Sequence, residues 1–154
     1  MPQPINHIIH QFRFDKGQPA KTIFVNAAML LLLFMLFNSK QAGISGDEEV
    51  HYQQSVKVYN YFSTFGKDQS ALDTPTTHLK YYGQSFDNLT TILIRWFNIE
   101  DIYTFRHLMN GLAGWLCILM AALLAVWLSG YGAGILTLFL FALSPLFWAT
   151  HRTT

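Results

Sequence analysis

An acidic run, Asp47-Glu48-Glu49, is the feature of this 154-residue sequence with the clearest chemical potential. A positioned carboxylate can act as a general base. The run also has a structural interpretation, because carboxylates in the first turn of a helix complement the helix dipole. Glu48 follows Ser45 in the Ser-x-x-Glu form of a capping box, and Glu49 falls on a polar helix face. Asp47 has no evident structural task, and it lies just after the first apolar segment, where a lipid-bound substrate would present its headgroup.

Few other residues suggest chemistry. His51 lies four residues after Asp47 and can share its helix face, but two ligands without a third predict no metal site. The alternative for His51 is a surface histidine flanked by tyrosine. Arg106 and Lys80 are long basic side chains that could serve as interfacial anchors. The sequence holds no nucleotide-binding, zinc or other cofactor motif, and we expect no cofactor.

The composition predicts an integral membrane protein. The chain is 51% hydrophobic and 12% charged, whereas soluble domains average about 25% charged residues. The apolar residues gather in three segments, 22–37, 108–129 and 132–149, with Pro145 near the end of the third. The second has 22 uncharged residues, enough to cross a hydrocarbon core of roughly 30 Å. We therefore predict an all-α membrane protein with three transmembrane helices, the last two joined by a tight turn at 129–132. A net charge of +1 gives no reason to expect nucleic acid as a partner.

The first apolar segment has two interpretations. It could be a cleaved signal peptide, since Arg13, Lys16 and Lys21 precede an apolar core. The long polar lead and the lack of a small-x-small cleavage site favour an uncleaved helix. Because the first helix usually sets orientation, we expect the head, residues 1–21, to be cytoplasmic. Residues 38–107 would then form an external loop, and residues 150–154 a truncated external end.

Seventy residues are too many for a bare connection, so the external loop should carry its own helices. One is expected near 46–64, where Tyr52, Val56, Tyr59 and Phe62 fall on one face. A second amphipathic helix is expected near 86–97. Both have aromatic apolar faces, which is typical of helices resting on a membrane surface. A further helix should start at Asn98-Ile99-Glu100-Asp101 and continue into the second span.

The order of short motifs resembles the GT-C class of membrane glycosyltransferases, and within it bacterial protein-mannosyltransferase-like enzymes. GDEEVHYQQ after the first span and HLKYYGQSFDNL later in the loop resemble the first external loop of that family. FRHLMNGLAGWLCIL resembles its Arg-led entry into the second span, and LSPLFWATHR its exit from the third. The resemblance covers roughly residues 20–152 and depends on the order of these motifs.

The resemblance implies a function. Asp47 matches the acidic residue taken as the general base of the family, and Glu48 matches its acidic neighbour. His51, Lys80, Tyr82 and Arg106 become candidate substrate-binding residues. Of these, Arg106 or Lys80 could pair with the lipid phosphate, as an alternative to a role as interfacial anchors. The implied reaction moves a sugar from a polyprenyl-phosphate-linked donor to an acceptor hydroxyl with inversion, in a bacterial inner or plasma membrane and with no metal. The acceptor is unknown.

The resemblance also implies that more protein is needed. Family members are much longer and carry a second acidic motif after the third span, where this sequence stops. We therefore expect an amino-terminal portion that is inactive by itself. The alternative is a small non-enzymatic membrane protein whose external loop binds or scaffolds a partner.

Overall fold

A computed structural model of the chain describes residues 18–75 and 78–144, and within them the only regular secondary structure is helical. The described residues form two compact units, one made of 18–41 with 110–144 and one made of the described part of 42–109. The expected head up to residue 17, the last part of the third apolar segment and the expected external end lie outside the described residues.

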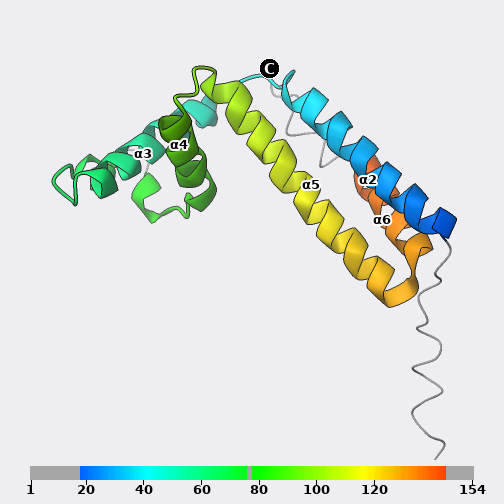
Figure 1. Cartoon of the computed structure of the whole chain (residues 1–154). Helices are drawn as coiled ribbons and strands as arrows, with labels where there is room; N and C mark the ends of the chain where they lie inside the picture. The colour runs from blue at the N-terminus through cyan, green and yellow to red at the C-terminus, as the bar shows by residue number, and fades with distance from the viewer. Residues whose placement is uncertain (1–17, 76–77, 145–154) are drawn as a thin grey trace, which may run out of the picture. The chain divides into compact units, whose positions relative to one another are not determined.

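Three helices build the first unit: α2 (Gln18–Ser39), α5 (Ile102–Ser129), whose first turns belong to the second unit, and α6 (Tyr131–Leu143) (Figure 1). At 1.5 Å per residue, α2 is roughly 33 Å long and α5 roughly 42 Å. Both are long and apolar enough to cross a membrane. The helices predicted at 22–37 and 108–129 are therefore confirmed as helices. The first extends past both expected bounds, whereas the second begins six residues early and ends where expected.

The third apolar segment behaves differently. Its helix, α6, has 13 residues and a length of roughly 20 Å, which is short of a hydrocarbon core of about 30 Å. It ends at Leu143, and Ser144 is extended (φ −67°, ψ 118°). The cause is Pro145, because a residue before proline is driven out of the helical region. Residues 145–149 of the expected span lie outside the described residues, so a third transmembrane helix stays a prediction.

The turn between α5 and α6 is as tight as the sequence predicts. It consists of Gly130 alone, with φ of 86°, a conformation that favours glycine. The backbone N–H of Gly130 donates to the Val126 carbonyl at 2.8 Å, which satisfies one of the last carbonyls of α5.

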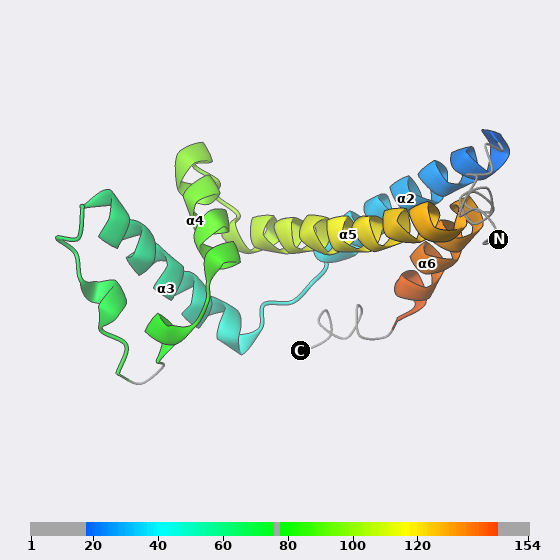
Figure 2. The same cartoon turned by 90° about the horizontal axis from the view of Figure 1, so that it is seen from below.

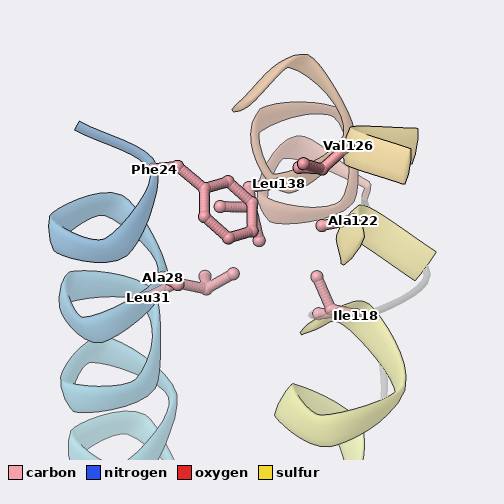
Figure 3. Packing of buried hydrophobic residues seen from close by; sticks show 7 residues of the cluster. All are labelled: Phe24, Ala28, Leu31, Ile118, Ala122, Val126 and Leu138. Carbon is pink, nitrogen blue, oxygen red and sulfur yellow. The ribbon is translucent and has the colours of Figure 1, made fainter. Parts of the chain in front are cut away.

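Small and apolar residues pack the helices of the first unit together. The buried cluster takes one side chain from α6 and three from each of the longer helices (Figure 3): Phe24, Ala28, Leu31, Ile118, Ala122, Val126 and Leu138. Trp115 Nε1 in α5 also donates to the Ala28 carbonyl in α2 at 2.8 Å. A Cβ built on Gly134 would overlap Val126 and lie 3.1 Å from the Ala122 carbonyl oxygen, so only glycine allows this approach of α6 to α5.

The second unit holds the two helices expected in the loop. They are α3 (Gly46–Ser63) and α4 (Ser85–Phe97), which lie against each other in both views (Figures 1 and 2). Two short 3₁₀ helices, η1 (Ser70–Leu72) and η2 (Leu79–Tyr81), interrupt the connection between them. Asn98 ends α4 in the left-handed conformation, a common helix C-terminus. The expected helix after Asn98 is also confirmed, because Asp101 Oδ1 accepts from the Thr104 N–H at 3.2 Å where α5 begins.

The interior of the second unit is unusually polar. Ser55 and Thr91, both fully buried, hydrogen-bond across α3 and α4 at 2.6 Å, and Gln54 Nε2 donates to the Ala71 carbonyl at 2.9 Å. Large apolar side chains instead lie on the outside of this unit: Ile44, Val50, Phe62, Phe65, Leu72, Tyr81, Tyr82, Leu89, Trp96 and Phe97. Polar contacts therefore join the helices, while an apolar surface faces outward.

Candidate functional site

The acidic run opens α3, as expected, but its three carboxylates have different surroundings. Asp47 is exposed and forms no hydrogen bond or ion pair with any described residue. Glu48 is partly buried and ion-paired. Glu49 accepts from Gln53 Nε2 at 2.6 Å and from the Tyr103 hydroxyl. The run therefore presents one free carboxylate beside two that are held.

The predicted capping box is wrong. Ser45 does occupy the position before the first residue of α3, but its side chain makes no capping hydrogen bond. The link between the two residues is a backbone one, from the Glu48 N–H to the Ser45 carbonyl at 3.1 Å. The Glu48 carboxylate is instead directed to Arg106 and His107 at the start of α5, which leaves it unable to cap α3.

A cluster of charged side chains joins the three helices of the second unit. His107 Nε2 lies 3.0 Å from Glu48 Oε2, and Arg106 Nε lies 3.7 Å from Glu48 Oε1. Arg106 Nη2 donates to Asp87 Oδ1 of α4 at 2.6 Å. Because the Arg106 side chain is 6% exposed and that of Glu48 12%, water screens this pairing far less than it screens a surface ion pair. The cluster therefore fixes the first turn of α3 against α4 and α5.

Arg106 was expected to serve either as an interfacial anchor or as a phosphate ligand. It is instead buried, with the guanidinium carbon 5.6 Å from the Tyr52 ring centroid. Its Nε and Nη1 are buried and form no hydrogen bond among the described residues. A phosphate could reach Arg106 only by displacing carboxylates that already neutralise it, so the geometry favours a structural role.

His51 joins the same cluster from α3. Gln84 Nε2 donates to His51 Nδ1 at 2.9 Å, and that nitrogen lies 3.8 Å from Asp87 Oδ2. Within residues 18–75 and 78–144, no three His, Cys, Asp or Glu side chains gather as a metal site would require. His51 thus has protein partners on the side that faces α4.

Lys80 and Tyr82 lie elsewhere in the second unit. Both are exposed and line a hollow between α3, α4 and the two 3₁₀ helices. Lys80 Nζ lies 5.3 Å from the Tyr81 ring centroid, and the ammonium has no ion-pair partner among the described residues. The structure therefore separates the six sequence-predicted site residues into three groups. Glu48, His51 and Arg106 belong to the charged cluster, Lys80 and Tyr82 line the hollow, and Asp47 stands apart from both.

Sequence reasoning missed three residues of this arrangement: Asp87, His107 and Gln84. Asp87 lies in the first turn of α4, where a carboxylate already has a dipole explanation. His107 was given no role of its own, because it lies in the apolar helix entry next to Arg106. One signal was available: two adjacent basic side chains at the start of an apolar helix need partners if they are buried.

Comparison of the chain with protein-family models, with curated proteins and with solved structures finds no match. The resemblance to GT-C enzymes is therefore carried by the sequence motifs alone.

Proposed function

We propose that the chain supplies the first membrane helices and the first external loop of a GT-C-type membrane glycosyltransferase. In this proposal, Asp47 is the general base that activates an acceptor hydroxyl. The single observation that carries the proposal is the contrast within the acidic run: Glu48 and Glu49 are engaged by neighbours, whereas the Asp47 carboxylate is exposed and free of protein partners.

A membrane location is supported by the exposure of α2 and α5. Only 17% and 22% of their most apolar windows are buried, whereas the core helix of a soluble protein would be mostly buried. Their outward-facing side chains include Leu30, Phe34 and Leu124. Lipid contact removes the cost of exposing this surface to water. The third transmembrane helix, expected at 132–149, remains part of this proposal.

The packing of α2 supports an uncleaved first helix over a signal peptide. Phe24, Ala28 and Leu31 of α2 belong to the buried cluster that α5 and α6 complete, and Trp115 donates to the α2 backbone. Removing α2 would expose this face and leave that indole N–H without its acceptor. A helix with these partners is part of the folded unit.

The proposed transfer reaction requires a general base, which the Asp47 carboxylate can supply. A sugar on a polyprenyl phosphate has a good leaving group, so the acceptor hydroxyl chiefly needs a base aligned for in-line attack at the anomeric carbon. The hydroxyl loses its proton to the Asp47 carboxylate as its oxygen bonds to the anomeric carbon. The bond to phosphate breaks on the opposite face, so the configuration inverts. The charged cluster of Glu48, Asp87, Arg106 and His107 fixes the first turn of α3, which keeps Asp47 in place.

The test is sugar transfer from a radiolabelled polyprenyl-phosphate donor in membranes of cells that carry a chromosomal Asp47→Asn change. Asparagine keeps the shape and loses the base, so transfer should fall by at least about a hundredfold, the usual scale for a positioned base. Glu49→Gln is the matched control, because glutamine keeps one oxygen that can accept from Gln53 and gains an amide group that can donate to the Tyr103 hydroxyl oxygen. Near-normal transfer by a normally folded Asp47→Asn protein would end the catalytic assignment.

A second candidate function is favoured by the apolar exterior of the second unit. Phe65 is 96% exposed, and Trp96 and Phe97 are each 71% exposed. Such a surface suits a partner subunit as well as a bilayer. Under this alternative the chain is a non-enzymatic scaffold, and Asp47→Asn would leave its partner bound and its cellular role intact.

A further inference from the structure

The outward side of α4 carries an apolar surface that the proposed chemistry does not use. Leu89 is 49% exposed, and Trp96 and Phe97, two turns further along the helix, are each 71% exposed. Phe86 and Leu93 lie three residues before and four residues after Leu89, so they share its side of the helix, and both are partly exposed. These five side chains form a continuous surface along α4, which we call the apolar strip.

The opposite side of α4 is the one that the protein covers, and it is largely polar. The buried residues of this helix are Thr90, Thr91 and Ile94. The hydroxyl of Thr91 contacts α3 by its hydrogen bond to Ser55. A surface helix in water shows the reverse distribution, with its apolar side buried and its polar side exposed. The outer side of α4 therefore favours an apolar environment.

The first half of α3 differs from α4 in this respect. Exposed side chains in its first two turns are those of Asp47, Glu49, Val50 and Gln53, and only Val50 among them is apolar. Tyr52, which belongs to the predicted apolar face of this helix, is partly buried. The part of α3 that carries the acidic run is therefore suited to water.

The connection to α5 keeps α4 close to a membrane surface. Residues 98–101 separate the two helices, and this stretch spans at most roughly 18 Å. Six further residues of α5, about 9 Å of helix, precede the uncharged stretch that begins at Leu108. Because α5 is long and apolar enough to cross a membrane, the end of α4 is tethered near the boundary where that crossing begins.

The size of the apolar strip favours lipid over a protein partner. One side of a 13-residue helix is roughly 20 Å long and 10 Å wide, about 200 Å² in projection, whereas each partner of a stable protein interface buries about 800 Å². A bilayer sets no such minimum, because each apolar side chain gains from insertion separately. Tryptophan is also enriched at the boundary between head groups and acyl chains. We propose that α4 is an interfacial helix that inserts the apolar strip into the lipid surface, while the first half of α3 stays on the aqueous side of α4.

This insertion does not depend on glycosyl transfer by Asp47, so it is tested by position alone. The full chain, with Cys117→Ser and either Leu89→Cys or Gln53→Cys, is labelled with an environment-sensitive fluorophore and reconstituted in phosphatidylcholine vesicles. Quenching is measured with a nitroxide on the lipid acyl chains and with iodide on both sides of the membrane. We expect the label at position 89 to lie roughly 5–10 Å below the head groups, quenched by nitroxide and shielded from iodide. The label at position 53 should show the opposite pattern.

Two variants test whether the strip itself causes the insertion. Trp96→Glu places a charge in the strip, seven residues from position 89 on the same side of α4, so the label there should lose its shielding from iodide. Val50→Glu is the matched control, because it replaces an exposed apolar side chain of α3 and should leave the label at position 89 shielded. Helical content by circular dichroism confirms that each variant is folded.

Each of the other results would overturn the proposal. Equal access of iodide to both labels, in vesicles and in native membranes, would show that the strip faces water. Shielding in vesicles without quenching by nitroxide would show that a second copy of the chain covers the strip, and shielding in native membranes alone would assign it to a partner subunit. Nitroxide quenching of both labels alike would contradict the aqueous position of α3. Unchanged shielding in folded Trp96→Glu protein would show that the strip does not drive insertion.

Discussion

Replacing Arg106 with methionine should loosen the second unit, because this residue connects α3, α4 and α5. Methionine keeps much of the apolar stem and removes the charge. Breaking a buried ion pair from one side costs about 3–5 kcal/mol. Two considerations lower this figure here: His107 still pairs with Glu48, and two buried Arg106 nitrogens with no hydrogen-bond partner among the described residues disappear with the side chain. We therefore expect a loss of about 2 kcal/mol.

Hydrogen exchange of α3 amides in the full chain, held in detergent and followed by mass spectrometry, measures this loss. When exchange reports the opening equilibrium, about 2 kcal/mol corresponds to roughly thirtyfold faster exchange. The matched control is Arg95→Met, because Arg95 is exposed at the end of α4 and has no ion-pair partner among the described residues. That change should stay within about 0.5 kcal/mol, or roughly twofold. If Arg106→Met also stayed within twofold, the cluster would not be what holds α3.

The remaining predictions concern the helix packing and the topology. Gly134→Ala should reduce the thermal stability of the first unit in detergent, because the new Cβ would overlap Val126. The control Gly132→Ala meets no atom within 4 Å and should be neutral or stabilising. Equal melting temperatures for the two variants would refute the close approach of α6 to α5. Ser55→Ala leaves Thr91 with a buried unpaired hydroxyl and should cost about 1–3 kcal/mol, measured by exchange of α4 amides; no change there would show that water replaces the serine. A cysteine placed at the exposed Gln69 should react with an impermeant reagent on intact cells, and protection there would invert the expected orientation.

The helices could be predicted well from the sequence because local signals fix them. Apolar runs set α2 and α5, and glycine or asparagine in left-handed conformations follows the ends of α5 and α4. Pro145 explains the end of α6 at Leu143. The apolar exterior of α4 was also predicted, since Leu89 and Trp96 are exposed as the amphipathic pattern implied.

The charged cluster could not be predicted, because it depends on which helices meet. Glu48 and His107 are 59 residues apart, and Asp87 and Arg106 are 19 apart on different helices. The Ser-x-x-Glu pattern predicted that Glu48 caps α3. Its carboxylate pairs instead with Arg106 and His107, which are distant in the sequence. Because Glu48 and Glu49 both have partners, Asp47 is the one residue of the run whose carboxylate has none among the described residues. Its role as the base stays a prediction.

Two residues that line the hollow were identified from the sequence. Lys80 and Tyr82 were candidate substrate ligands, and both line it.

The most direct test of the proposed function measures two properties of one protein, Asp47→Asn, in native membranes and after purification. The first is the rate of sugar transfer from a polyprenyl-phosphate-linked donor, and the second is hydrogen exchange of α3. Our account predicts that transfer falls at least about a hundredfold while α3 exchange changes by less than about fivefold, the scale of one carboxylate's interaction with the helix dipole, because Asp47 is exposed and has no protein partner among the described residues. Transfer at nearly the normal rate, with α3 equally protected, would contradict the assignment of Asp47 as the base.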